Sequence, residues 1–462
     1  MPVITRRHFL KVSSTTLVAT ALMGSKVAGQ TSRPNFLFIM LDDMPKWMLE
    51  HMPITTAGIG SVGLTFEDFY GAQPLCSPNR ASFLTGRYPH NHTVVNNTAA
   101  ARQFREKGLD KNTFATSLKT AGYRTGFVGK YFNGYGASTE KNYIPPGWDR
   151  WVGLASDGNL TILANVNGSW SDTGVSVREE ADWLADHVDN FIGGPTEPWF
   201  CFYGPRAPHG PLTPSKASEH YADDIPLRRP VNFNEPDGMA DKPTGVGLRR
   251  KALTTTEIAD LEMTQEGMLE ELQDVDAQVG RLLDTLEARG QLANTYVFFT
   301  SDNGFMLGEN RQKGKDLAYE ASAELPFLLR GPGVGVGTPN ALASMVDIRA
   351  TLENLAGIGG NVGYDGRSLA QVFSSTPSTW RKRLLFESPP SGTRVGWYAL
   401  YEPPFIYVEW TTGAKELYNL ATDPGELKSQ HATQPSLVRR FSSQLASMKT
   451  AKGATLRAAE VA

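Results

Sequence analysis

Two pairs of oxygen-bearing side chains stand directly after apolar runs of the sequence. Asp42 and Asp43 follow "NFLFIML", and Asp302 and Asn303 follow "TYVFFTS". Adjacent carboxylates repel one another unless a positive group lies between them. Carboxylate and amide oxygens are hard ligands that suit Ca²⁺ or Mg²⁺, and the sequence has no HExxH motif or Cys/His cluster for zinc. Together the two pairs predict a metal site, whereas a single aspartate would be explained equally well as a helix N-cap.

Positively charged side chains occur near the same predicted strand ends. Lys130 directly follows the apolar run "GFVG", and we expect Arg80 and Lys315 in loops on the same face. Fixed cations around a hard metal are what a tetrahedral oxyanion needs, whether phosphate or sulfate. His209, between prolines in "APHGP", has the chemistry to protonate a leaving alkoxide. Taken singly, each of the two lysines is explained equally well as solvated surface charge, and the histidine as an ordinary loop residue.

The elements that position these side chains follow from the apolar pattern. Short continuous apolar runs such as "YRTGFVG" and "PWFCFYG" predict strands buried on both faces. Helical spacing of apolar residues predicts helices over 112–120 and, much longer, over 255–289. Strands that alternate with helices indicate an α/β fold, in which ligand sites lie at the carboxyl ends of the strands.

The pattern changes after about residue 360. "WYALYEPPFIYVEW" predicts a hairpin, "KELYNLATDP" a strand and turn, and residues 436–449 a terminal helix. We therefore predict a smaller C-terminal subdomain over 359–462. Residues 217–254 are polar, rich in proline and without a clear period, which predicts a long surface insertion.

Composition and the N-terminus narrow the class of protein. The 462 residues are 40% hydrophobic and 20% charged, with a net charge of −3, so we expect no nucleic-acid partner. Residues 1–30 carry Arg6 and Arg7 before a short apolar stretch, which predicts a twin-arginine export signal and a secreted or periplasmic protein. No later segment is apolar enough for a membrane span.

The two cysteines differ in their settings. Cys201 lies in an apolar run and is explained by core packing, although in an oxidising compartment the two could form one disulfide. Cys76 begins "CSPNRASFLTG", in which C-x-P-x-R precedes Thr85-Gly86. This stretch resembles the signature of the type I sulfatases, and the resemblance extends over nearly the whole chain after the signal. In that family the cysteine is oxidised to formylglycine, whose hydrated aldehyde is the nucleophile.

The resemblance implies a fold and a set of residue roles. The implied fold is alkaline-phosphatase-like: a large mixed sheet flanked by helices over 31–358, and a small C-terminal antiparallel sheet with a helix. The implied ligands of Ca²⁺, with Mg²⁺ as the alternative, are Asp42, Asp43, Asp302, Asn303 and position 76. The implied catalytic residues are Cys76, Arg80, which holds the hydrate, Lys130 and Lys315, which grip the sulfate, and His209, which with Lys315 assists the leaving alcohol.

The sequence departs from the family pattern near Lys130. Many members have a histidine two residues after that lysine, and this chain has Phe132 followed by Asn133. In the family that histidine helps to release the sulfate. We therefore expect His92 to take its place as the base of the second step, or Asn133 to act in a positioning role, both near the substrate.

"RYPHNHTVVNN", "GKYFNGYG" and "KDLAYEAS" look like the branch of N-acetylglucosamine-6-sulfatases and heparan 6-O-sulfatases. The resemblance thus implies a sulfated sugar of the glucosamine 6-sulfate type as substrate, and a formylglycine-generating enzyme as a maturation partner. Two alternatives stay open: a phosphodiester or phosphonate monoester hydrolase on the same fold, and a non-catalytic protein that binds sulfated glycans.

Overall fold

The computed structural model describes residues 33–462 except 138–140, 156–159, 195–197, 236–238 and 361–362. The predicted export signal lies outside the described residues. The strands are β1 (Asn35–Leu41), β2 (Leu64–Thr65), β3 (Phe69–Tyr70), β4 (Arg124–Gly129), β5 (Arg150–Leu154), β6 (Thr161–Val166), β7 (Ser169–Ser176), β8 (Trp199–Gly204), β9 (Thr295–Ser301), β10 (Met306–Leu307), β11 (Lys313–Gly314), β12 (Phe327–Arg330), β13 (Ala343–Ser344), β14 (Leu384–Ser388), β15 (Trp397–Glu402), β16 (Phe405–Trp410) and β17 (Lys415–Asn419).

The α-helices are α1 (Pro53–Thr55), α2 (Cys76–Thr85), α3 (Pro89–His92), α4 (Ala100–Glu106), α5 (Phe114–Thr120), α6 (Glu180–Ile192), α7 (Thr255–Ala288), α8 (Glu320–Ala323), α9 (Asp347–Leu355), α10 (Pro435–Met448) and α11 (Gly453–Ala459). The predicted long helix is confirmed as α7. It begins at a capping box in which Thr254 and Glu257 satisfy each other's backbone N–H groups.

The described part of the chain builds one nine-stranded sheet in the order β2-β12-β9-β1-β8-β4-β5-β6-β7. The five central strands, from β9 to β5, are parallel to one another, whereas β12 and β2 at one edge and β6 and β7 at the other pair antiparallel. The predicted fold class, a large mixed sheet flanked by helices, is therefore confirmed.

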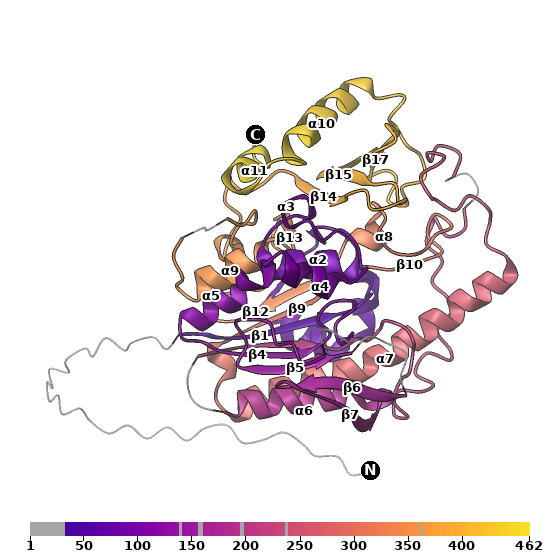
Figure 1. The fold of residues 1–462 in the computed structure, drawn as a ribbon. Helices are drawn as coiled ribbons and strands as arrows, with labels where there is room; N and C mark the ends of the chain where they lie inside the picture. Colours follow the sequence, from indigo (N-terminus) through magenta and orange to yellow (C-terminus); the bar gives the residue numbers. More distant parts are fainter. Residues whose placement is uncertain (1–32, 138–140, 156–159, 195–197, 236–238, 361–362) are drawn as a thin grey trace, which may run out of the picture. The chain divides into compact units, whose positions relative to one another are not determined.

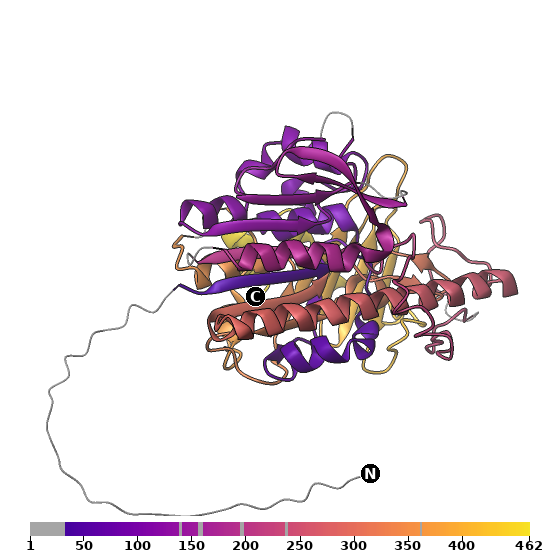
Figure 2. The ribbon, with the colours of Figure 1, turned by 90° about the horizontal axis from the view of Figure 1, so that it is seen from below.

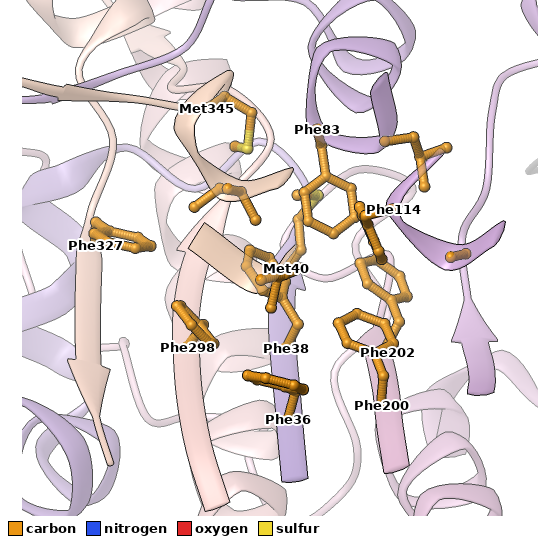
Figure 3. Close-up of a cluster of buried hydrophobic side chains, with 14 of the residues drawn as sticks. Phe36, Phe38, Met40, Phe83, Phe114, Phe200, Phe202, Phe298, Phe327 and Met345 are labelled. Carbon is orange, nitrogen blue, oxygen red and sulfur yellow. The ribbon is translucent and has the colours of Figure 1, made fainter. Parts of the chain in front are cut away.

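Each face of this sheet has its own core. In β1, Phe36 and Phe38 pack with Phe83 of α2 and Phe114 of α5, as Figure 3 shows. The alternate residues of β1 point to the other face, where they join the apolar sides of α6 and α7. Those two helices lie side by side on that face in Figure 2, and Arg281 of α7 pairs with Asp182 of α6 at 2.9 Å. A strand buried on both faces explains the continuous apolar run of β1.

The C-terminal region forms a four-stranded antiparallel sheet, β14-β15-β16-β17, with α10 and α11 (Figure 1). The predicted hairpin is β15 and β16, and the predicted terminal helix is α10. The ring of Phe441 on α10 stacks on Tyr407 of β16, with 5.9 Å between their centroids. His90 of α3 meets Glu387 of β14 at 2.8 Å, so this small sheet adjoins the region around α2 and α3.

Two expectations need correction. Residues 217–254 carry no α-helix or strand among those described, as predicted, but they are not confined to the surface. The Lys242 side chain is fully buried, donates to Tyr418 Oη at 2.8 Å and lies over the ring of Tyr319. This lysine anchors the insertion to the C-terminal sheet. The two cysteines are both free and buried, so the disulfide considered for them does not form.

Among the described residues, none of the helices combines the length and the apolar character needed to cross a bilayer.

Candidate active site

Four neighbouring strands of the main sheet end at one edge, and a predicted site residue follows each end. Strands β9, β1, β8 and β4 are adjacent in that order and parallel. Asp302, Asp42 and Lys130 directly follow β9, β1 and β4, and His209 lies in the loop after β8. Because the carboxyl ends of parallel strands meet at one edge, side chains distant in sequence converge there.

Helix α2 places Cys76 at its first position, facing this edge. The side chain is buried, and its Sγ lies 2.9 Å from Lys315 Nζ and 3.9 Å from Asp43 Oδ1. Burial, reinforced by the negative charge of Asp42, raises the pKa of the Cys76 thiol to about 12. An unmodified thiol at this position therefore stays protonated near neutral pH, and a thiol is a weak nucleophile.

The backbone places Lys130 over Asp42. Gly129 has a φ of 132°, and a Cβ there would lie 2.0 Å from the carbonyl oxygen of Gly204, so only glycine allows β4 to approach β8 this closely. Lys130 then donates its N–H to the same carbonyl at 2.8 Å, and its Nζ contacts Asp42 Oδ2. Burial alone would raise the pKa of Asp42, but Lys130 and the surrounding cations hold it well below its usual range.

The carboxylates of Asp43 and Asp302 form ion pairs of their own with nearby cations. Lys315 Nζ contacts Asp43 Oδ1, and Arg80 Nε donates to Asp302 Oδ2 at 2.7 Å. Arg80 also donates through Nη1 to the Lys130 carbonyl oxygen at 2.8 Å. Burial and the nearby charge of Asp42 raise the pKa of Asp302 to about 6. The predicted acids and cations thus form one buried network.

Several polar atoms of this network are left unsatisfied. Asp42 Oδ1, Asn303 Oδ1 and Arg80 Nη2 are buried and have no hydrogen-bond partner within the described part of the chain. Buried polar groups without partners are rare, because each costs free energy. The first two are hard oxygen donors that a divalent cation would satisfy. Ligand atoms of four residues lie within 4.8 Å of one another: Asp42, Asp43, Cys76 and His209. The residues present therefore fit a divalent metal.

His209 lies at the accessible side of the site. Its Nε2 is 3.8 Å from Asp43 Oδ2, its Nδ1 is 2.6 Å from the Gly210 carbonyl oxygen, and 23% of the side chain is exposed. The structure thus brings His209 together with the acids and cations, at a place where solvent reaches it.

The two residues predicted near the substrate have different fates. Asn133 Oδ1 accepts a hydrogen bond from Ser77 Oγ at 2.7 Å, next to Cys76. The structure does not bring His92 into the site. Its side chain is buried, with Nε2 3.0 Å from Ser82 Oγ, and its Nδ1 accepts from the Val94 N–H at 3.1 Å. Because the ring is buried and both of its nitrogens already have partners, the expectation that His92 lies near the substrate as the base of the second step is corrected.

Two supporting residues were missed in the sequence, although both lie inside the Cys76 motif. Ser77 Oγ accepts from the Asn133 N–H at 3.0 Å, which fixes the segment after Lys130 against α2. Asn79 accepts from the Ala72 N–H at 2.9 Å and donates to the Asp302 carbonyl oxygen at 2.5 Å. The feature of the sequence that could have indicated them is their short polar side chains within the same helical turn as Cys76 and Arg80.

Comparison with known proteins decides the family. The sulfatase family model matches residues 34–358. The chain belongs to the sulfatase family. It is 33% identical over 391 residues to the human N-acetylglucosamine-6-sulfatase, covering 80% of this sulfatase and 70% of that protein. It is 26% identical over 484 residues to the N-acetylglucosamine-6-O-sulfatase of Bacteroides thetaiotaomicron, covering 87% and 83%. This sulfatase is therefore a sulfuric ester hydrolase.

Solved structures share its fold. One, a complex with its substrate D-glucosamine-2-N,6-O-disulfate, has a TM-score of 0.75 and 21% identity, over 90% of this sulfatase and 97% of that chain. A phosphonate monoester hydrolase of Agrobacterium radiobacter has a TM-score of 0.71 and 20% identity, over 90% and 95%. Members of the sulfatase family use a formylglycine and a divalent metal, and the buried acidic cluster is compatible with such a metal.

Proposed function

We propose that this sulfatase removes the 6-O-sulfate of a glucosamine-type sugar, with formylglycine at position 76 and Ca²⁺ as cofactor, Mg²⁺ being the alternative. The observation that carries the proposal is the place of Cys76, buried at the start of α2 among two lysines and the unsatisfied oxygens. The sugar is supported by the human and Bacteroides relatives named for N-acetylglucosamine 6-sulfate, and by the glucosamine disulfate bound to the structural neighbour.

The proposed cofactors have defined places. Asp42, Asp43, Asp302, Asn303 and position 76 would hold the metal. When present, formylglycine supplies a hydroxyl nucleophile, and the metal takes up negative charge on the sulfate oxygens. Hard oxygen donors favour Ca²⁺ or Mg²⁺ over softer ions.

The chain's own residues orient the ester and move its protons. Lys130 and Lys315 bind sulfate oxygens and stabilise the charge that grows on them. Arg80 holds the hydroxyl at position 76. His209, assisted by Lys315, donates a proton to the bridging oxygen as the alcohol leaves. Because His92 is buried with both nitrogens engaged, the now neutral His209 accepts the proton of the second step.

The remaining parts of the proposal concern maturation and organisation. Residues 1–30 act as a twin-arginine export signal, and a formylglycine-generating enzyme modifies Cys76. Residues 31–358 form the catalytic domain and residues 359–462 the C-terminal subdomain.

A mass measurement tests the nucleophile. The tryptic peptide 47–80 from protein made in its native host should carry one oxygen in place of one sulfur and two hydrogens at position 76. An intact thiol in an otherwise active preparation would contradict the formylglycine assignment.

Activity is then compared on glucosamine 6-sulfate and on matched aryl sulfate and aryl phosphate esters. Cys76→Ala should abolish turnover, and Cys201→Ala, in the core of β8, should retain it. Faster hydrolysis of the phosphate ester would favour the phosphohydrolase alternative.

A further inference from the structure

Asp316, the residue after Lys315, is fixed more completely than its loop position suggests. Its φ of 68° is in the left-handed region, which is unusual for a residue other than glycine. Its N–H donates to the Pro74 carbonyl oxygen at 2.8 Å, and its own carbonyl oxygen accepts from Trp397 Nε1 at 3.1 Å. The backbone next to Lys315 is therefore held from two sides, by the segment that leads into Cys76 and by the C-terminal sheet.

The Asp316 carboxylate is held in the same way. Oδ1 accepts from Gln73 Nε2 at 3.1 Å, and Oδ2 pairs with Arg394 Nη1. Gln73 stands three residues before Cys76, whereas Arg394 lies in the loop between β14 and β15 of the small sheet. Backbone N–H, backbone carbonyl and both carboxylate oxygens of Asp316 thus all have partners. A left-handed conformation persists where its surroundings determine it this fully.

Arg394 is the centre of this junction. Its Nη2 donates to the Val95 carbonyl oxygen at 2.8 Å and to the Pro389 carbonyl oxygen at 2.7 Å, and its Nη1 also contacts Ser388 Oγ. The planar guanidinium therefore joins the segment after α3, the loop of the small sheet and the Asp316 carboxylate. The guanidinium has several N–H donors in a fixed planar geometry, so it can bind these partners at once. The single ammonium group of a lysine lacks that geometry.

We propose that Arg394, acting through Asp316, positions Lys315 against position 76, so that the C-terminal subdomain is part of the catalytic apparatus. Arg394 is a positioning residue, because it touches neither position 76 nor the other site residues. Lys315 Nζ lies 2.9 Å from Cys76 Sγ, and its backbone is continuous with the residue that Arg394 holds. The inference rests on the proposed role of Lys315 at the sulfate.

The test compares two arginines of the same subdomain in the metal-loaded, matured enzyme. Arg394→Ala should lower kcat for glucosamine 6-sulfate about 10- to 100-fold, the cost of a small displacement of a catalytic group, with KM changed less than about threefold. Arg394→Lys, which keeps the charge but not the fork, should recover part of kcat. Hydrogen exchange of the peptide spanning 313–317 should become faster in Arg394→Ala.

Arg383→Ala is the matched control. Arg383 also pairs with a carboxylate, Glu402 at 2.7 Å, and donates to two backbone carbonyls, of Ala459 and Ala462. None of these partners adjoins the site, so kcat per folded molecule and exchange at 313–317 should match the wild type.

The inference is overturned if Arg394→Ala keeps wild-type kcat and wild-type exchange at 313–317, or if Arg383→Ala reproduces both changes. Failure of the proposed function looks different: wild-type protein with formylglycine and metal would leave sulfate esters intact. In that case the exchange comparison still decides whether Arg394 orders the Lys315 segment.

Discussion

Two buried aspartates of this sulfatase differ in how completely their carboxylate oxygens are hydrogen-bonded, one in a structural cluster and one at the active site. Asp347, at the start of α9, receives both arms of Arg381, at 2.6 and 2.9 Å, and also accepts the N–H groups of Arg367 and Ser344. Both of its oxygens thus accept two hydrogen bonds. Asp42 is equally buried, but one of its oxygens meets Lys130 and the other has no partner within the described residues.

The difference indicates where an ion is needed. Both carboxylate oxygens of Asp347 are fully hydrogen-bonded by the protein, and the cluster joins α9 to the region before β14. Around Asp42 the protein leaves hard oxygens unsatisfied beside cations that crowd the carboxylates. Buried unpaired groups cost free energy unless something else binds them. A divalent metal would satisfy the open oxygens of Asp42 and Asn303.

The substitution Asp42→Asn tests whether Asp42 acts in the chemistry and not mainly in stability. We expect turnover of glucosamine 6-sulfate to fall about 10³-fold, the scale reported for losing one preorganised electrostatic group. The protein as purified should also contain less bound metal, which elemental analysis measures. The unfolding free energy should fall less than in Asp347→Asn, because Asp42 accepts far fewer hydrogen bonds. An Asp42→Asn enzyme with normal metal content and normal turnover would remove Asp42 from the site.

The reciprocal substitution, Asp347→Asn, should act on stability. It leaves the buried Arg381 with a single carboxylate partner, Glu460 at 3.3 Å, and breaking a buried ion pair in this way costs at most about 3–5 kcal/mol. Chemical denaturation measures that loss. Turnover per folded molecule should stay within about twofold of the wild type, since Asp347 lies outside the network around position 76. A large loss of kcat at unchanged stability would contradict the division between the two clusters.

Much of the fold was readable in the sequence where apolar runs are continuous. The runs that became β1, β4, β8 and β9 are buried on both faces, and the acids follow β1 and β9 whereas Lys130 follows β4. The strands β5, β6 and β7 and the helix α6 were not predicted. In β7 every residue is exposed or half-buried, so the apolar signal is weak there. The short helix α11, after α10, was missed as well.

The site was predictable to the extent that its residues follow strands or lie in one motif. The sequence motif drew attention to Cys76 and Arg80, and the structure places both in the network. The Arg394–Asp316 pair was out of reach, because it joins residues 78 positions apart in loops with no periodic pattern. His92 was misplaced for a related reason: a histidine near a motif carries no mark of the direction in which its ring points.

The position of His92 leads to the smallest predicted effect, on pH dependence. Burial, with added repulsion from nearby cations, lowers the pKa of His92 to about 3, against about 6.5 in an unfolded chain. Between these values the unfolded state binds one proton more, so stability is present above pH 6.5 and is lost as the pH falls, at about 1.4 kcal/mol per pH unit. His92→Asn, which keeps an acceptor for the Val94 N–H, should flatten this slope while leaving the kcat–pH profile unchanged. The opposite result, a changed kcat–pH profile with an unchanged stability slope, would show that His92 acts in catalysis. His92 would then belong to the active site and not to the residues that only hold the fold.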